Sequence, residues 1–373
     1  MSLKGIRKAV LQVDPYIPGK TTEEVMFDKG LNNVIKLGSN ENPYGPFPNA
    51  LNAMTEELSR INTYPDVSFK EIKRAVAELT GLAPENVCIS HGAEGMLQTI
   101  GKTFIEPGDE VIIPSSTYGL YREISKLMGA KVVEVPMKEE HYIDLHGCLM
   151  ALSERTKLIW LNNPNNPTGT VFDREDIMEI FRKMPPHSWV ILDEAYGEFT
   201  DPSYLPDTGS LVREGKNVIS VRTFSKAFGL AGARVGYCLC CEEMSVIIDT
   251  VSEPFNANRI GIAGALATLK YDRKDYLHAL ARIRNERDRL VIAFESLGLR
   301  PVRSHTNFVF VETGFNADMV ADRMLDKGVI VRPCKGWDYP SALRITVGTP
   351  RENEIMLLAL SEILDDLRKE VAD

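Results

Sequence analysis

Lys226 stands in the segment of this sequence with the most chemical character, Thr223-Phe-Ser-Lys-Ala-Phe-Gly-Leu-Ala-Gly-Ala-Arg234. It follows an apolar, strand-like run and is flanked by hydroxyls and small residues. Burial lowers the pKa of a lysine amine and frees it to attack an aldehyde, so Lys226 is a candidate Schiff-base lysine. Arg234, with Thr223 and Ser225, could bind a phosphate through its bidentate guanidinium. Taken alone, the segment is equally compatible with a surface lysine in a glycine-rich loop.

Two further segments end strand-like runs with polar residues. Val190-Ile-Leu-Asp-Glu-Ala-Tyr196 delivers Asp193 to the carboxyl end of a strand, where ligands bind in open α/β sheets. A carboxylate there could keep the pyridine nitrogen of pyridoxal phosphate protonated, and Tyr196 could hydrogen-bond the phenolic oxygen of the ring. Asn162-Asn-Pro-Asn-Asn-Pro-Thr-Gly169 forms a rigid turn that could present Asn166 to the same oxygen. Each segment by itself is also explained as an ordinary turn.

A fourth segment, Ser90-His-Gly-Ala-Glu-Gly-Met96, is typical of a tight turn from a strand into a helix. The N–H groups at such a helix start could hold a phosphate. His91 is expected to be a loop or packing residue, because no second metal ligand stands at helical or hairpin spacing. Tyr118, in Ser115-Ser-Thr-Tyr-Gly119, could stack on a cofactor ring or pack as an ordinary tyrosine.

The elements that must position these residues alternate between about residues 70 and 250, where short apolar runs are separated by helix-length stretches. This pattern predicts a mostly parallel sheet covered on both faces. The expected strands are Val87–Ser90, Glu110–Pro114, Lys131–Val135, Lys157–Asn162, Trp189–Asp193, Asn217–Arg222 and Arg234–Cys240. The helix-length stretches between them include Met96–Phe104, Tyr121–Met128 and Asp173–Lys183.

After Asp275 the pattern changes to a mixture of helices and strands. The sequence predicts a long helix near Tyr276–Leu297, a last helix that begins with the capping residues Thr349, Pro350 and Glu352, and the strands Asn307–Glu312, Val329–Arg332 and Leu343–Val347. We therefore expect an α/β protein with a large domain at residues 46–275. Residues 1–45 and 276–373 are expected to supply an N-terminal arm and a smaller α+β domain.

Composition narrows the class of protein. The 373 residues carry 52 acidic and 43 basic side chains, a formal charge of −9, which argues against a general nucleic-acid or membrane-binding surface. No secretory signal or run of about 18 apolar residues is present, so a cytoplasmic protein is expected. The six cysteines, of which Cys238, Cys240 and Cys241 crowd one strand, are expected to be reduced and structural, with no metal site.

Taken together, these segments resemble the fold-type-I aminotransferases, which use pyridoxal 5'-phosphate, and within them the histidinol-phosphate aminotransferases. The match covers nearly the whole chain. Its most specific pieces are Asn162-Asn-Pro-Asn-Asn-Pro-Thr-Gly169, Asp193-Glu-Ala-Tyr196, Ser225-Lys-Ala-Phe-Gly-Leu-Ala-Gly232 with Arg234, and Leu343-Arg-Ile-Thr-Val-Gly348.

The resemblance implies a role for each matching residue. Lys226 would hold the cofactor as a Schiff base and serve as the base and acid of the proton shift. Asp193 would pair the pyridine nitrogen, Tyr196 and Asn166 the phenolic oxygen, and Tyr118 would stack on the ring. The cofactor phosphate would be bound by Ala93, Glu94, Thr223, Ser225 and Arg234, and by Tyr64 from the neighbouring subunit, which implies a homodimer with shared active sites.

The resemblance also implies the substrates, L-histidinol phosphate and 2-oxoglutarate, in histidine biosynthesis. Arg344 would take the α-carboxylate of glutamate, Tyr16 and Arg332 the distal phosphate of histidinol phosphate, and Asn40 lies in a segment similar to the substrate-binding region of these enzymes. The chain departs from the family pattern at Gly95, where a second acidic residue is usual after Ala93.

Other functions remain open at this point. An aromatic-amino-acid aminotransferase would use the same catalytic residues, and Trp337 and Tyr339 suit an imidazole or an aromatic side chain equally. A decarboxylase of an amino-acid phosphate would need no 2-oxoglutarate. A cofactor-binding regulator would need a DNA-binding module, and no basic helix-turn-helix segment precedes residue 40. A nicotinamide dehydrogenase is disfavoured, because the glycines after Lys226 do not form the strand-bound dinucleotide motif.

Overall fold

A seven-stranded sheet forms the centre of the computed structural model, which describes residues 5–15, 18–172 and 174–372. Its strand order is β2-β8-β7-β6-β5-β3-β4, and every neighbouring pair is parallel except the two pairs that involve β8. The strands are β2 Val87–Ser90, β3 Glu110–Pro114, β4 Lys131–Val135, β5 Thr156–Asn162, β6 Trp189–Asp193, β7 Val218–Thr223 and β8 Gly236–Leu239. The expected mostly parallel sheet is confirmed.

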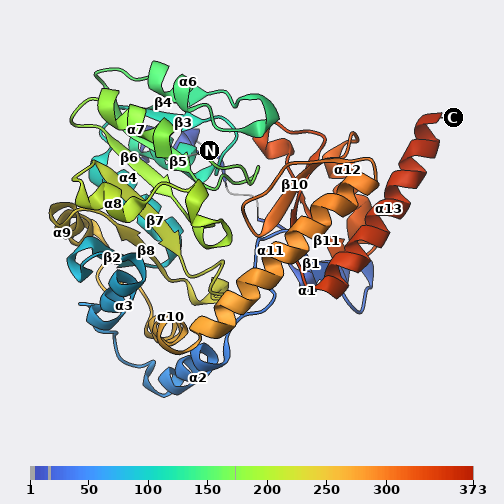
Figure 1. Cartoon of the computed structure of the whole chain (residues 1–373), viewed down its shortest axis with the longest axis horizontal. Coiled ribbons are helices and arrows are strands. Elements are labelled where there is room, and N and C mark those ends of the chain that lie inside the picture. The colour runs from blue at the N-terminus through green and yellow to red at the C-terminus, as the bar shows by residue number, and fades with distance from the viewer. Residues whose placement is uncertain (1–4, 16–17, 173, 373) are drawn as a thin grey trace.

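Both faces of this sheet are buried, which explains why its strands are almost continuously apolar. Val111 and Ile113 of β3 enter one core, whereas Ile112 between them enters another. The first core is completed by α4 Gly92–Phe104, α5 Leu120–Met128 and α9 Glu242–Val251, and the second by α6 Leu145–Met150, α7 Arg174–Lys183 and α8 Thr208–Arg213. Figure 1 shows α4, α6, α7, α8 and α9 around the sheet.

The C-terminal part of the chain builds a second, antiparallel sheet in the order β12-β13-β10-β9. Its strands are β9 Arg300–Pro301, β10 Phe308–Glu312, β12 Arg332–Pro333 and β13 Ala342–Thr346. The helices of this part are α11 Arg273–Ser296, α12 Ala317–Asp326 and α13 Pro350–Ala372. At the start of α13, Thr349 N–H donates to Glu352 Oε2 at 2.7 Å and Glu352 N–H donates to Thr349 Oγ1 at 3.4 Å, so the predicted capping box is confirmed.

The N-terminal residues contact both parts of the molecule. Strand β1 Ile35–Lys36 pairs in parallel with β11 Val329–Ile330, which joins this segment to the C-terminal part. Nearer the N-terminus, the Arg7 guanidinium donates to Leu127 O of α5 at 2.7 Å. The remaining α-helices of the described residues are α1 Thr22–Lys29, α2 Pro48–Glu57, α3 Lys70–Thr80 and α10 Arg259–Tyr271.

Two predicted strands differ from the structure. The run Val329–Arg332 is not one strand, because β11 pairs with β1 whereas β12 pairs with β13 in the other sheet. The chain therefore changes sheets at Val331, which alternation of apolar residues alone does not reveal. The strand predicted to begin at Arg234 begins at Gly236, because Arg234 has a φ of 51° and this left-handed conformation is incompatible with a strand.

Candidate active site

Polar residues from three adjacent strands meet at the carboxyl edge of the large sheet. Asn162 ends β5 and is paired in register with Asp193, which ends β6, while Thr223 ends the neighbouring strand β7. Tyr118 follows β3 at the same edge, and α4 begins directly after β2. A cavity of about 430 Å³ opens at this edge, where parallel α/β sheets bind their ligands.

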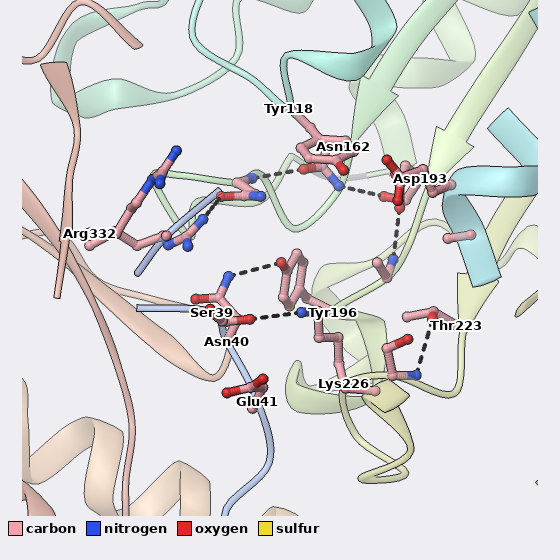
Figure 2. A pocket seen from close by; sticks show the side chains of 18 of the residues that line it. Ser39, Asn40, Glu41, Tyr118, Asn162, Asp193, Tyr196, Thr223, Lys226 and Arg332 are labelled. Atoms are coloured by element: carbon pink, nitrogen blue, oxygen red, sulfur yellow. Dashed lines mark hydrogen bonds between the residues drawn. The ribbon is translucent and has the colours of Figure 1, made fainter. Parts of the chain in front are cut away.

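The cavity brings together most of the residues that the sequence analysis selected. They are Asn40, Ala93, Glu94, Tyr118, Asn166, Asp193, Tyr196, Thr223, Ser225, Lys226, Arg234, Arg332 and Arg344. Tyr64 does not line it, and its side chain is 77% exposed on the surface, stacked on Phe255 with ring centroids 4.4 Å apart. Tyr16 lies outside the described residues. Figure 2 shows Arg332 at one side of the cavity and Thr223 at the opposite side.

Lys226 is partly buried, and its Nζ donates to the backbone oxygen of Ser39 at 3.0 Å. Burial, together with the nearby charge of Arg344, lowers the pKa of the Lys226 amine to about 8. Glu41, which also lines the cavity, opposes this shift in part. An amine with such a pKa is neutral in about a tenth of molecules at pH 7, far more than for an ordinary lysine, and the neutral form is the one that attacks an aldehyde.

Asp193 is a buried carboxylate, and the side chain and N–H group that donate to it from the described residues are neutral. Its Oδ1 accepts from the Ala195 N–H at 3.0 Å and its Oδ2 accepts from the Tyr121 hydroxyl at 2.7 Å. Burial raises the pKa of Asp193 to about 6, although both donors favour the ionised form. A cationic ring nitrogen would offset the cost of burying this charge, so the residue fits a pyridinium partner.

Two asparagines, Asn40 and Asn166, connect residues at the edge of the large sheet with residues of the second sheet. Asn40 Nδ2 donates to the Tyr196 hydroxyl at 2.9 Å (Figure 2), and the Asn40 N–H donates to Thr346 Oγ1 at 2.9 Å. Asn166 Oδ1 accepts from the Arg344 guanidinium at 2.7 Å. Residues of both sheets are therefore held in one network around the cavity.

The end of the cavity near Thr223 has the character of a phosphate cradle. Arg234 Nη1 donates to Ser225 Oγ at 3.3 Å, and the guanidinium lies 4.0 Å from the Glu94 carboxylate. A Cβ at Gly92, the first residue of α4, would lie 2.7 Å from the Arg234 guanidinium, and φ there is +80°. The left-handed φ favours glycine at this position, and the free backbone N–H groups at the start of α4 can bind an anion beside the arginine.

The other end of the cavity holds two arginines around one indole ring. The guanidinium carbons of Arg332 and Arg344 each lie 5.6 Å from the Trp337 ring, within cation–π range. Trp337 Nε1 donates to Thr117 O at 2.8 Å, which fixes the indole against the large sheet. This end can therefore bind two anionic groups of a substrate.

Comparison with known proteins agrees with this geometry. Residues 32–360 match the family model for aminotransferase class I and II. The chain belongs to this aminotransferase family. Among its relatives, histidinol-phosphate aminotransferase from Moorella thermoacetica is 39% identical over 360 residues, covering 96% of this chain and 92% of the relative. Histidinol-phosphate aminotransferase 2 from Pasteurella multocida is 38% identical over 362 residues, covering 96% of this chain and 98% of the relative.

A solved structure supports the same relationship. The crystal structure of histidinol-phosphate aminotransferase from Sinorhizobium meliloti in complex with pyridoxal-5'-phosphate superposes with a TM-score of 0.89 at 30% identity, covering 98% of this chain and 99% of that one. This chain thus has the fold-type-I aminotransferase architecture.

The aminotransferase departs from the family pattern at Gly95 for a steric reason. Gly95 is buried in α4, and a Cβ there would lie 2.5 Å from the His91 imidazole. His91 precedes the helix as its N-cap residue and fills the space that a second acidic side chain would need. The packing role predicted for His91 agrees with this contact.

Sequence reasoning missed several residues of the site. Ser39 contributes a backbone oxygen, which any residue could supply, so its side chain carried no signal. Asn162 was part of a recognised motif without a role; its Oδ1 accepts from the Asn166 N–H at 2.8 Å and its Nδ2 donates to Asp193 O at 2.9 Å. Tyr121 was placed only at the start of an expected helix, and its contact with Asp193 depends on tertiary structure.

Three buried thiols of the aminotransferase, those of Cys88, Cys238 and Cys240, lie within 4.8 Å of one another. Structural zinc sites use four ligands, whereas this group offers three. The expectation that these cysteines are reduced and structural stays a prediction.

Within the part of the chain that the structure describes, every helix is too short or too polar to cross a membrane.

Proposed function

We propose that this aminotransferase transfers the amino group of L-histidinol phosphate to 2-oxoglutarate, in histidine biosynthesis. The observation that carries the proposal is the presence of Arg332 and Arg344 in the same cavity as Lys226. Two guanidinium groups suit the anionic groups of these substrates, the α-carboxylate beside the amine of glutamate and the distal phosphate of histidinol phosphate. The similarity to histidinol-phosphate aminotransferases over more than nine-tenths of the chain supports this choice of substrate.

The residues at the carboxyl edge of the sheet fit the cofactor. Pyridoxal phosphate, when bound, supplies an aldehyde that takes up amino groups and a ring that withdraws electrons from the substrate's Cα. In our proposal Asp193 pairs the pyridine nitrogen, Tyr118 stacks on the ring, and Tyr196 and Asn166 bind the phenolic oxygen. The phosphate is bound by the start of α4 at Ala93 and Glu94 and by the side chains of Thr223, Ser225 and Arg234.

Lys226 would move the proton at the substrate's Cα. With a pKa lowered to about 8, its amine can take up a proton and release it again near neutral pH. The contact with Ser39 O gives the amine a second polar position, to which it can withdraw without losing its hydrogen bond.

The two substrates would use the two arginines differently. Arg344 is buried and held by Asn166 Oδ1 and by Gly38 O, each at 2.7 Å, so its guanidinium is fixed for a carboxylate. We assign it to the α-carboxylate of glutamate, and Arg332 with Tyr16 to the distal phosphate of histidinol phosphate. Asn40 is a further substrate-binding residue in this proposal. Both donors occupy one pocket in turn, as the two half-reactions of a transaminase require.

We also propose that the aminotransferase is a homodimer with Tyr64 of one subunit near the cofactor phosphate of the other. Ile61, Tyr64, Val67 and Phe255 are all large, exposed apolar side chains, and Tyr64 and Phe255 stack on one another. Exposed apolar groups gathered in this way are typical of a subunit interface.

We also propose that the enzyme is cytoplasmic. All six cysteines are free, as suits the reducing conditions of that compartment.

The test is a single-turnover absorbance measurement on the cofactor-loaded protein without keto acid. L-Histidinol phosphate should bleach the absorbance of the lysine-bound cofactor at much lower concentration than L-phenylalanine. The reverse preference would make the protein an aromatic-amino-acid aminotransferase. Absence of bleaching with either donor would contradict amino transfer. Borohydride reduction should fix the cofactor to Lys226, and labelling of another lysine would refute the catalytic assignment.

Arg332→Ala tests the substrate assignment separately from the chemistry. Loss of a charge-assisted contact to phosphate should raise the KM for histidinol phosphate about 10-fold or more, with phenylalanine turnover little changed. Arg300→Ala is the matched control, because Arg300 is an exposed arginine on β9 whose guanidinium pairs with Glu312 at 3.0 Å. An unchanged KM in Arg332→Ala would refute the phosphate assignment.

A further inference from the structure

Tyr121 is a fully buried residue of α5 that does not line the cavity but contacts two residues that do. Its hydroxyl donates to Asp193 Oδ2 at 2.7 Å. Its ring lies edge-on to Tyr118, with centroids 5.7 Å apart and planes at 83°. We infer that Tyr121 is a positioning residue that sets both the charge of the carboxylate facing the cofactor's ring nitrogen and the tilt of the aromatic ring stacked on the cofactor.

This inference rests on the proposed function, which gives Asp193 to the pyridine nitrogen and Tyr118 to the ring face. The two residues come from different elements, Asp193 from the end of β6 and Tyr118 from the loop after β3. Figure 2 shows them on the same side of the cavity. Tyr121 connects them, so one side chain controls the geometry on the face and at the nitrogen of the same ring.

The hydroxyl of Tyr121 completes the orientation of the carboxylate. Asp193 Oδ1 is held by the Ala195 N–H at 3.0 Å, and Tyr121 holds Oδ2, so the plane of the carboxylate is fixed at both oxygens. Burial and the charge of Asp193 raise the pKa of the Tyr121 hydroxyl well above its ordinary value. Tyr121 therefore remains a donor throughout the working pH range and favours the ionised form of Asp193.

The Tyr121 ring is itself held rigidly. It stacks on Trp160 of β5, with centroids 5.3 Å apart and planes at 7°. Trp160 and Tyr121 are both fully buried in the core between the sheet and helices α4, α5 and α9. Tyr118 and Tyr121 lie three positions apart in the turn that leads into α5, where the Tyr121 N–H donates to Tyr118 O at 3.3 Å. Movement of the loop at Tyr118 is thereby coupled to the sheet.

The substitution Tyr121→Phe removes one oxygen and keeps the ring. The buried Asp193 then loses a donor, its affinity for a proton rises, and the proton shared with the cofactor nitrogen moves toward the carboxylate. A less positive ring withdraws less electron density from the nitrogen through which Lys226 is joined to the cofactor, so this nitrogen holds its proton more strongly. The pH midpoint of the absorbance change of the bound cofactor should therefore rise by about one unit. The same loss should lower kcat about 10-fold with a small change in KM.

Tyr237→Phe is the matched control. Tyr237 is also fully buried, on β8, and its hydroxyl lies in the field of Arg222 rather than at Asp193. It should keep the wild-type pH midpoint. In an Asp193→Asn background, Tyr121→Phe should have no further effect on the midpoint, because the tyrosine acts through that carboxylate.

The outcomes separate this inference from the proposed function. If wild-type protein shows no pH-dependent absorbance from a lysine-bound cofactor, the proposed function fails. If wild-type protein shows it and Tyr121→Phe has the same midpoint and kcat, the proposed function stands and the positioning role of Tyr121 is refuted. A fall in the thermal unfolding temperature with an unchanged midpoint would reduce Tyr121 to a packing residue and also refute the role.

Discussion

Lys226 carries its charge in surroundings that oppose it. The ordinary pKa of a lysine is 10.5, whereas burial and Arg344 lower that of Lys226 to about 8 in the folded protein. Between these two pH values the unfolded chain binds more protons than the folded protein, so the stability of the cofactor-free protein rises with pH over this interval. The charge on Lys226 therefore destabilises the folded state below about pH 8, and the effect disappears toward pH 10.5.

We expect Lys226→Met to stabilise the cofactor-free protein at pH 7, because it removes the buried charge and keeps an unbranched apolar side chain. The advantage over wild type should shrink as pH rises from about 8 to 10.5. Urea unfolding at a series of pH values measures it, with Lys274→Met, an exposed lysine on α11, as the control. A stability difference that does not change with pH would show that the folded-state pKa of Lys226 is not lowered.

The sequence was most informative about the identity of individual site residues. Lys226, Asp193 and Asn166 were found from their types and neighbours, and the structure brings all three to one cavity. Tyr121 was missed because its partner Asp193 lies 72 positions away, and no local pattern marks a buried hydroxyl that donates across a sheet. The contribution of Ser39 was invisible because the backbone provides it.

At the scale of elements, the turn after Lys226 determines how close the N-terminal segment comes to the site. The backbones of Gly45 and Gly229 touch: a Cβ built on Gly229 would lie 2.7 Å from Gly45 Cα. Asn42 Nδ2 donates to Ala227 O at 2.8 Å just beside this contact. This backbone contact and the Asn42 hydrogen bond together hold Ser39 and Asn40 next to Lys226. The pattern of apolar residues predicted the strands on either side of the Lys226 turn, β7 and β8. It could not predict that this turn and the loop at Gly45 would lie in contact.

Gly229→Ala should therefore destabilise the protein by at least about 2 kcal/mol, because φ at Gly229 is +67° and the methyl group meets backbone atoms that cannot move aside. Cofactor affinity should fall as well, since the segment with Ser39 and Asn40 is displaced. Thermal unfolding and cofactor titration measure the two effects. Gly336→Ala is the control, because nothing lies within 4 Å of its Cβ position. Equal stability of the two variants would contradict the close contact.

At the scale of the whole molecule, the site joins two sheets that lie far apart in the sequence. Lys226 and Asp193 follow strands of the large sheet, whereas Arg332 and Arg344 belong to β12 and β13 of the smaller one. We propose residues 46–275 as the large domain and residues 1–45 with 276–373 as the arm and small domain. The parallel pairing of β1 with β11 supports the assignment of the N-terminal segment to the second unit. The alternation of elements predicted the large sheet and the strands of the C-terminal part, but not that Val329–Arg332 is divided between the four-stranded sheet and a separate two-stranded sheet with β1.

A single chain brings every predicted site residue within its described part to the cavity except Tyr64, which lies on the surface, 77% exposed. If Tyr64 serves the site of the other subunit, Tyr64→Ala should lower activity about 10-fold through loss of a hydrogen bond to phosphate. Lys226→Ala should be nearly inactive. A hybrid dimer of these two variants then has one site with both residues intact and one site that lacks both.

The purified hybrid, isolated with a different affinity tag on each subunit, should recover roughly half of the wild-type activity, because a two-fold dimer has two equivalent sites and one is restored. Activity no greater than the mean of the two parent dimers would mean that Tyr64 acts within its own subunit or not at all. Hybrids of Lys226→Ala with wild type control for subunit exchange. The half-site recovery is decisive because a residue that acts within its own subunit cannot restore activity in the hybrid.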